Sequence, residues 1–144
     1  MKPWKIQDFI QPKDIGYVNP IREWIDGQPI KAGVKIDTRI QYLEVTKVWD
    51  SSFCKKLRGY DEIYELRIVF NNIQYRPLGC MGPGAGEFTI LIGAIEKGRF
   101  VPPDAPRTAE ERRKLVFEDR RYVHEHEYCK GPITDKSERE QGIS

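Results

Sequence analysis

The most informative segment of the chain is IYELRIVFNNIQYRPL, residues 63–78. Apolar and polar side chains alternate over Ile63–Phe70, which is typical of a strand with one face toward a core. Asn71 and Asn72 follow, and asparagine tolerates the positive φ of a two-residue hairpin turn. The segment therefore predicts an antiparallel hairpin of two strands, Ile63–Phe70 and Ile73–Leu78.

Downstream of the hairpin, one more strand and one helix are expected. A loop over Gly79–Gly86 precedes Phe88–Lys97, a run that is apolar on both faces and therefore typical of a central strand. Residues 108–111, with the sequence TAEE, have the pattern of a capping box that starts at Thr108. This box predicts a last helix that runs to about Tyr128.

Upstream of the hairpin, the pattern predicts a short strand and two helices. The strand covers about Lys5–Ile10. Asn19 and Pro20 are a favourable N-cap and first residue for a short helix that ends at Gly27. Apolar residues at helical spacing over Lys31–Val48 predict a longer helix. The order strand, two helices, three antiparallel strands and a helix predicts a small α+β domain.

Length and composition fit one globular domain. The chain has 144 residues, of which 39% are hydrophobic and 32% charged, and one domain usually takes about 100–200 residues. We predict a single domain over residues 1–128 and a polar, flexible tail over 129–144. No run reaches the roughly 18 apolar residues of a membrane span. The charged N-terminus is unlike a signal peptide and the three cysteines are far apart, so a cytoplasmic location without membrane contact is expected.

Bulk charge gives no sign of a nucleic-acid-binding protein. Lys and Arg number 24 against 22 Asp and Glu, for a formal net charge of +2. Any phosphate-binding surface therefore depends on how particular basic residues are arranged. The glycine-rich run 82–86 lacks the Lys and the Ser or Thr of a P-loop and joins two predicted strands, which favours a flexible hairpin connection over a nucleotide site.

His124, His126 and Cys129 are residue types that bind metal ions and lie close together in the sequence. Their spacing matches no closed zinc pattern, and residues two apart on a helix face different directions. We therefore expect no metal site. We also expect no cysteine nucleophile, because no cysteine has a partner histidine at a recognisable spacing.

The predicted sheet carries the candidate site. Arg67 shares a strand face with Glu65, Arg76 lies in the paired strand, and Lys97 ends the next strand. Antiparallel pairing could bring Arg67 and Arg76 together, with Lys97 at the same rim. Basic residues that meet on a concave sheet fit a phosphodiester. The alternative, that Glu65 and Arg67 are ordinary solvent-facing strand residues, stays open on the pattern alone.

The predicted last helix carries basic and acidic residues at interleaved positions. Such mixed charges usually form a solvated face with pairs three and four residues apart. Some of the arginines, Arg112 and Arg113 among them, are nonetheless candidates for RNA phosphates, because a guanidinium fork suits phosphate oxygens.

Several short segments, in this order along the chain, carry a family resemblance. They are Asn19-Pro20-Ile21-Arg22-Glu23-Trp24, Lys56-Leu57-Arg58-Gly59, Ile63-Tyr64-Glu65-Leu66-Arg67, Tyr75-Arg76, Phe88–Leu91, Glu96-Lys97 and the helix with Ala109 and Arg112-Arg113. Over roughly Asp14 to Val116 the chain resembles the RelE/ParE toxin superfamily, and it is most similar to the phage-derived, HigB-like branch.

The resemblance implies a fold and an activity. The implied fold is α+β, a small twisted antiparallel sheet of about four strands packed against N-terminal helices, with a C-terminal helix. The implied activity is that of a type II toxin: a ribosome-dependent mRNA endonuclease that inhibits translation and is neutralised by an antitoxin, often a helix-turn-helix protein. The implied reaction uses the ribose 2′-hydroxyl as nucleophile and needs no metal or cofactor. The protein must move two protons and stabilise the charged phosphate.

The resemblance also implies roles for particular residues. Arg67 and Arg76 would clamp the phosphate and Lys97 would add charge, while Glu65 belongs to the same motif and fits either proton transfer or a structural role. The further residues implied to contact RNA are Lys56, Arg58, Arg112 and Arg113.

The chain departs from the family pattern at two places. Pro77 has no backbone donor, which predicts an edge or bulged strand directly after Arg76. Glu96 stands where the family commonly has a basic residue. Two alternatives on the same fold therefore stay open, a non-catalytic module that binds a phage or host protein and a gyrase-inhibiting toxin, because fold alone does not determine function.

Overall fold

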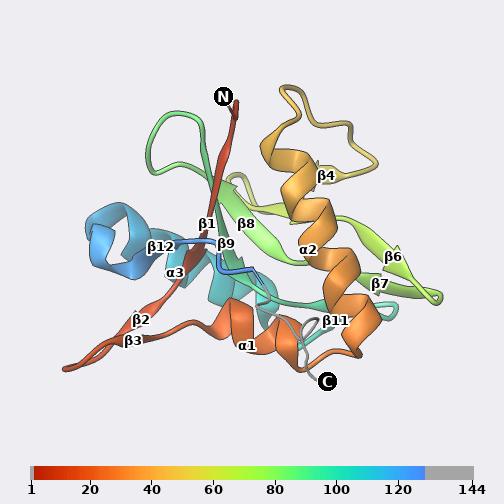
Figure 1. Ribbon diagram of the computed structural model, residues 1–144, viewed down its shortest axis with the longest axis horizontal. Helices are drawn as coiled ribbons and strands as arrows, with labels where there is room; N and C mark the ends of the chain where they lie inside the picture. Colours follow the sequence, from red (N-terminus) through yellow and green to blue (C-terminus); the bar gives the residue numbers. More distant parts are fainter. Residues whose placement is uncertain (1, 129–144) are drawn as a thin grey trace, which may run out of the picture.

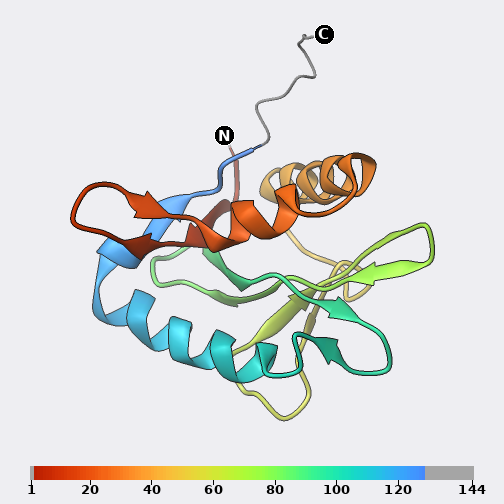
Figure 2. The ribbon, with the colours of Figure 1, turned by 90° about the horizontal axis from the view of Figure 1, so that it is seen from below.

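The computed structural model describes residues 2–128, and it has helices on both faces of a central sheet. The helices are α1 (Pro20–Asp26), α2 (Ile30–Glu44) and α3 (Ala105–Glu118), followed by a 3-10 turn, η1, at Arg120–Tyr122. Figure 1 shows α2 crossing one face of the sheet, and Figure 2 shows α1 and α2 on one side of it and α3 on the other. The predicted α+β class is confirmed. The predicted tail, 129–144, lies outside the described residues.

The larger sheet has six strands and is mixed. In order across the sheet its strands are β12 (Val123–Glu125), β1 (Lys5–Phe9), β9 (Glu87–Ile92), β8 (Leu78–Met81), β5 (Tyr64–Leu66) and β4 (Cys54–Lys56). The β1 strand runs parallel to β9, and the other neighbours are antiparallel. The larger sheet therefore has more than the expected four or so strands, and it contains one parallel pair where only antiparallel pairs were expected.

A second sheet and a short ribbon complete the β structure. The second sheet has four antiparallel strands in the order β11 (Phe100–Val101), β10 (Ile95–Glu96), β7 (Ile73–Tyr75) and β6 (Ile68–Phe70). The ribbon pairs β2 (Gln11–Pro12) with β3 (Tyr17–Val18). The β6–β7 hairpin turns at Asn71 and Asn72, which have φ of 51° and 63°. The predicted asparagine turn is thus confirmed.

Three segments of the chain cross from the larger sheet to the smaller one. The crossings divide what the sequence predicted as three continuous strands, and they lie at Arg67, at Arg76-Pro77 and at Gly93-Ala94. We call this region the seam. Backbone hydrogen bonds hold the crossings side by side: Leu66 N–H donates to the Pro77 carbonyl at 2.8 Å, and Arg76 N–H to the Ala94 carbonyl at 2.8 Å. The break at Pro77 agrees with the irregular strand expected there.

Two glycines allow close packing around these crossings. A Cβ on Gly93 would lie 1.9 Å from the Trp24 ring, and a Cβ on Gly79 would lie 2.5 Å from the Thr89 carbonyl and 2.6 Å from the Phe88 ring. The predicted loop Gly79–Gly86 therefore begins as strand β8, because Gly79 packs directly against β9.

Helix α2 ends earlier than predicted. It stops at Glu44, and Val45 and Val48, which the apolar pattern placed on the helix, are largely exposed. Side-chain donors satisfy its last carbonyls: Thr46 Oγ1 donates to the Tyr42 carbonyl at 2.6 Å, and Trp49 Nε1 to the Leu43 carbonyl at 3.0 Å. With these carbonyls satisfied, the helix ends at Glu44 and does not continue to Val48.

The last helix is also shorter than predicted and begins before the expected cap. It covers Ala105–Glu118, with Pro106 in its first turn, and Thr108 lies inside it with its N–H donating to the Asp104 carbonyl at 3.0 Å. The predicted capping box is thus wrong. After Glu118 the chain leaves the helix, and Val123–Glu125 form β12, which pairs antiparallel with β1.

Each face of the larger sheet has its own hydrophobic core. The core under α1 and α2 includes Ile6, Ile21, Ile25, Ile36, Ile40, Leu66 and Phe88. The core under α3 includes Phe9, Ile63, Leu78, Leu91, Ala109 and Val116. Within residues 2–128, no helix has the length and apolar character needed to span a membrane.

Candidate functional site

The seam brings the predicted arginines and Glu65 together. Arg67 Nε lies 3.1 Å from Glu65 Oε2, and Arg76 Nε lies 3.9 Å from the same oxygen. Arg67 sits at one crossing and Arg76 at the next, while Glu65 lies in the middle of β5. Two guanidinium groups therefore converge on one carboxylate.

Arg76 is the more enclosed of the two arginines. It is 3% exposed, its Nη2 donates to the Gln74 side chain, and its Nε lies 3.5 Å from Glu96 Oε1. Burial and the nearby Arg67 cation lower the pKa of Arg76, while Glu65 and Glu96 act in the opposite direction. Arg76 is therefore part of a cluster of two guanidinium groups and two carboxyl groups, those of Arg67, Arg76, Glu65 and Glu96.

Glu65 is a carboxylate in an unfavourable setting. Burial raises its pKa, and the Arg67 and Arg76 cations offset only part of that rise, with Glu96 adding to it. Lys55, opposite Glu65 in the β4–β5 register, also favours the ionised form. The carboxylate is consequently more basic than an exposed glutamate.

Two buried donors at the seam lack a hydrogen-bond acceptor within residues 2–128. They are Nε of Arg67 and Nε of Arg76. Both lie within ion-pair distance of Glu65. At 3.1 Å the Arg67 Nε is close to the carboxylate but makes no hydrogen bond to it, and at 3.9 Å the Arg76 Nε is too far away for one. A buried donor without an acceptor is destabilising by about 1–3 kcal/mol, which an anion at the seam would relieve.

Lys97 does not join this cluster. It lies exposed on the turn after β10, where its N–H donates to the Arg99 carbonyl at 2.8 Å. The strand instead directs Glu96 to Arg76. Lys56 is exposed on the edge strand β4, and Arg58 is exposed just after it. Lys97 was expected at the same rim as Arg67 and Arg76, and the structure does not place it there. Its predicted contribution of charge to the phosphate, and the predicted RNA contacts of Lys56 and Arg58, stay predictions.

Arg112 and Arg113 have structural contacts on α3. Arg112 Nη1 donates to the Leu91 carbonyl at 2.8 Å, and its guanidinium lies 4.6 Å from the Phe9 ring centre. Arg113 lies 4.4 Å from the Phe117 ring centre. Arg112 thus links α3 to the sheet, and Arg113 packs on a ring of α3 itself, both on the face of the sheet opposite α2. Their contact with RNA stays a prediction.

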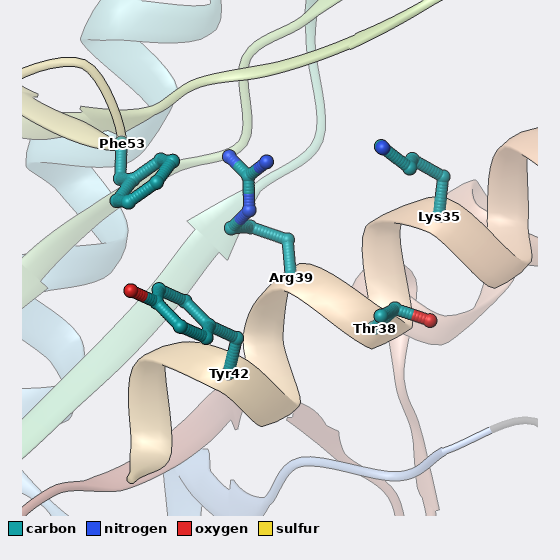
Figure 3. Close-up of a pocket in the computed structure, with 5 residues that line it drawn as sticks. All are labelled: Lys35, Thr38, Arg39, Tyr42 and Phe53. Atoms are coloured by element: carbon teal, nitrogen blue, oxygen red, sulfur yellow. The ribbon is translucent and has the colours of Figure 1, made fainter. Parts of the chain in front are cut away.

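A basic and aromatic groove next to the seam was not predicted. Its lining residues are Lys35, Thr38, Arg39 and Tyr42 of α2 and Phe53 before β4, and Figure 3 shows the Arg39 guanidinium beside the Phe53 ring. Arg39 Nη1 donates to the Arg67 carbonyl at 2.8 Å, which joins the groove to the seam. The signal in the sequence was the spacing of Lys35, Arg39 and Tyr42 on one helix face.

His126 is buried between two carboxylates that belong to different elements of the fold. Its Nδ1 lies 2.8 Å from Asp8 Oδ1 and its Nε2 lies 3.0 Å from Asp37 Oδ1, so both ring nitrogens donate to carboxylates. His124 lies on the outer side, stacked on Tyr17, and Cys129 lies outside the described residues. Within residues 2–128, no group of three or more His, Cys, Asp or Glu side chains is arranged to hold a metal ion.

No protein-family model matches the chain, and comparisons with curated proteins and with solved structures found no match. The resemblance to RelE/ParE toxins therefore rests on the sequence motifs alone.

Proposed function

We propose that this protein is the toxin component of a type II toxin–antitoxin system and cleaves mRNA on the ribosome. The observation that carries the proposal is the convergence of the Arg67 and Arg76 guanidinium groups on Glu65 at the seam. Paired guanidinium groups supply charge and directed N–H donors, which are what a phosphodiester needs. The RelE/ParE-like motifs contain these same three residues.

The chemistry is a transfer within the RNA. The 2′-hydroxyl of one ribose loses its proton to a base and attacks the adjacent phosphorus. The bond from phosphorus to the 5′-oxygen of the next nucleotide breaks, and that oxygen takes a proton from water. The products are a 2′,3′-cyclic phosphate and a 5′-hydroxyl. Arg67 and Arg76 stabilise the additional negative charge of the crowded phosphate, and Glu65, whose burial raises its pKa, accepts the proton of the 2′-hydroxyl.

The exposure of the two arginines sets the order in which a phosphate meets them. The Arg67 side chain is 32% exposed and is the accessible member. Arg76 lies behind it, with the 41% exposed Glu96 side chain against its Nε. An incoming phosphate therefore contacts Arg67 first and reaches Arg76 by displacing the Glu96 carboxylate.

A growth assay with message analysis tests the proposal. Tightly induced expression in a bacterium should arrest growth, and primer extension on a translated reporter should map cuts that end in a 5′-hydroxyl. Arg67→Ala should abolish both effects, whereas Arg107→Ala, a matched loss of an exposed arginine on α3, should leave both intact. Full toxicity of a folded Arg67→Ala variant, or intact message in arrested wild-type cells, would overturn the proposal.

The proposal includes the partners that such a toxin needs. They are a cognate antitoxin, expected to be a helix-turn-helix protein, and the ribosome with its mRNA in the cytoplasm. Co-expression of a protein encoded by a small gene adjacent to this one should restore growth.

A non-catalytic binding module is the second candidate. It is favoured by one observation, the balance of Arg67 and Arg76 by Glu65 and Glu96, which leaves the seam without net charge. In that case induced cells grow normally, the protein accumulates in soluble form, and the reporter mRNA stays intact.

A further inference from the structure

The groove beside the seam has the size and the lining of a ligand site. Its volume is about 390 Å³, and its lining combines two cations, two hydroxyl groups and two aromatic rings without any carboxylate. Ligand sites in proteins commonly have volumes of about 300–1,000 Å³. Figure 3 shows Lys35 and Arg39 extending from α2 on the same side, with Tyr42 one turn further along.

The four groove residues on α2 form one face of the helix. Positions 35, 38, 39 and 42 have the spacing i, i+3, i+4 and i+7, which aligns side chains along one stripe. A separate stripe of the same helix, with Ile36, Ile40 and Leu43, is buried in the core. The groove face is therefore held rigidly by a helix whose buried stripe cannot move without disturbing the core.

Arg39 carries an uncompensated positive charge in this groove. Its guanidinium lies 4.3 Å from the Phe53 ring centre and donates to the Arg67 carbonyl, but it has no carboxylate partner within residues 2–128. Burial lowers the pKa of Arg39, yet the group stays charged because guanidinium is a very strong base. An anion in the groove would supply the missing partner.

The aromatic side chains offer a surface for a flat group. Tyr42 is 46% exposed, and its ring meets the Phe53 ring edge to face, with centres 5.5 Å apart and an interplanar angle of 75°. Arg39 covers one face of Phe53, so the exposed ring of Tyr42 is the one that a base can stack on. A base on an aromatic ring next to phosphate-binding cations is the usual arrangement for single-stranded nucleic acid.

We propose that this groove binds one nucleotide of single-stranded RNA, with the base on Tyr42 and its phosphate at Lys35 and Arg39. The assignment rests on the proposed function and deepens it, because the groove joins the seam at two points. Arg39 donates to the Arg67 carbonyl, and Arg67 N–H donates to the Phe53 carbonyl at 2.8 Å. A strand whose scissile phosphate lies at the seam thus places a neighbouring nucleotide in the groove.

A binding assay with an uncleavable RNA tests the assignment. The probe is a dye-labelled RNA of eight nucleotides with 2′-O-methyl riboses, and its affinity is measured by fluorescence anisotropy at several salt concentrations. Tyr42→Ala should weaken binding roughly tenfold, within the range for one stacked base, and Tyr42→Phe should restore it. Lys35→Ala should reduce the slope of log affinity against log salt by about 0.7, the value for one phosphate contact on a single strand.

Matched controls and the opposing outcomes are built into the same assay. Phe117→Ala and Lys114→Ala remove an exposed aromatic ring and an exposed lysine from α3, and both should leave RNA affinity unchanged. Unchanged affinity and salt slope in Tyr42→Ala and Lys35→Ala would overturn the assignment. Binding of polyglutamate that depends on Tyr42 as strongly as RNA binding does would assign the groove to an acidic peptide and also overturn it.

Failure of this inference is distinguishable from failure of the proposed function. If wild-type protein leaves reporter mRNA intact, the nuclease proposal fails whatever the groove binds. If wild type and Tyr42→Ala cleave reporter mRNA equally and bind the RNA probe equally, the nuclease proposal stands and the groove assignment fails.

Discussion

Replacement of His126 by glutamine should remove a pH-dependent part of the stability. The His126 side chain is fully buried between Asp8 of β1 and Asp37 of α2, at 2.8 Å and 3.0 Å. Arg22 donates to Asp37 at 3.0 Å, and Asn19 donates to Asp8 at 2.9 Å. The imidazolium is thus the cation shared by two buried carboxylates, and it fastens the chain after β12 to both.

The pKa of His126 gives the size and sign of this effect. Burial alone would lower it, but hydrogen bonds and charges from Asp37 and Asp8 outweigh burial and raise the pKa to about 9 from an ordinary 6.5. That difference corresponds to roughly 3 kcal/mol of stability. Because the folded state has the higher pKa, the contribution is complete below pH 6.5 and is lost as the pH rises through 9.

Urea denaturation and NMR titration measure the effect. Wild type should exceed His126→Gln in free energy of unfolding by about 3 kcal/mol at pH 6, and the difference should shrink at pH 9.5. The chain has only two histidines, so the ring protons of His126 can be followed directly in wild type even if the variant does not fold. The reasoning is refuted if the His126 midpoint lies below 7, or if both proteins show the same pH dependence.

Three further predictions concern the seam and the sheet. Glu96→Gln should strengthen binding of the uncleavable RNA about threefold in the same anisotropy assay, because it removes a carboxylate that competes for Arg76 and such an exposed pair is worth up to about 1 kcal/mol. Gly93→Ala should lower the free energy of unfolding in urea by about 2 kcal/mol or more, because its Cβ would meet the Trp24 ring at 1.9 Å. Glu87 has a pKa of about 2, lowered chiefly by the hydrogen bond that it accepts from Arg120 of η1. Wild type should therefore lose about 1 kcal/mol relative to Glu87→Gln as the pH falls from 5 to 2, a figure reduced for solvent screening.

The features that were predictable from the sequence are those with local signals. The Asn71-Asn72 turn and the α1 cap were predictable because the deciding residues are adjacent in the chain: Asn19 Oδ1 accepts from the N–H groups of Ile21 and Arg22 at 3.0 Å and 2.9 Å. Strand β12 was missed because its partner is β1, at the other end of the chain. The local pattern of residues 108–128 contains no information about a strand so distant in the sequence, so it predicted a helix there instead of a strand.

The candidate site was partly predictable for a related reason. The hairpin register alone brings Arg67 and Arg76 near one another, and the structure has that proximity around Glu65. In the structure Glu96, and not the expected Lys97, contacts Arg76. The crossing at Gly93-Ala94 interrupts the predicted continuous strand, so the residues of β10 that face the seam differ by one position from those expected. Because neighbouring strand residues face opposite sides, a shift of one position replaces a cation by an anion.

If the protein binds RNA as proposed, the arrangement of charge explains why the composition gives no sign of it. At the seam, two arginines face two glutamates, so exchanging Glu96 for one phosphate leaves the number of ion pairs unchanged. Such an exchange gains little free energy, so most of the affinity for RNA must come from contacts outside the seam. Arg39, which contacts the seam and has no carboxylate partner within residues 2–128, is the cation at which a phosphate gains an ion pair without breaking one. If the RNA is also held by the ribosome, the exchange at Arg76 becomes intramolecular, and the weak seam then suffices for cleavage of bound message but not of free RNA.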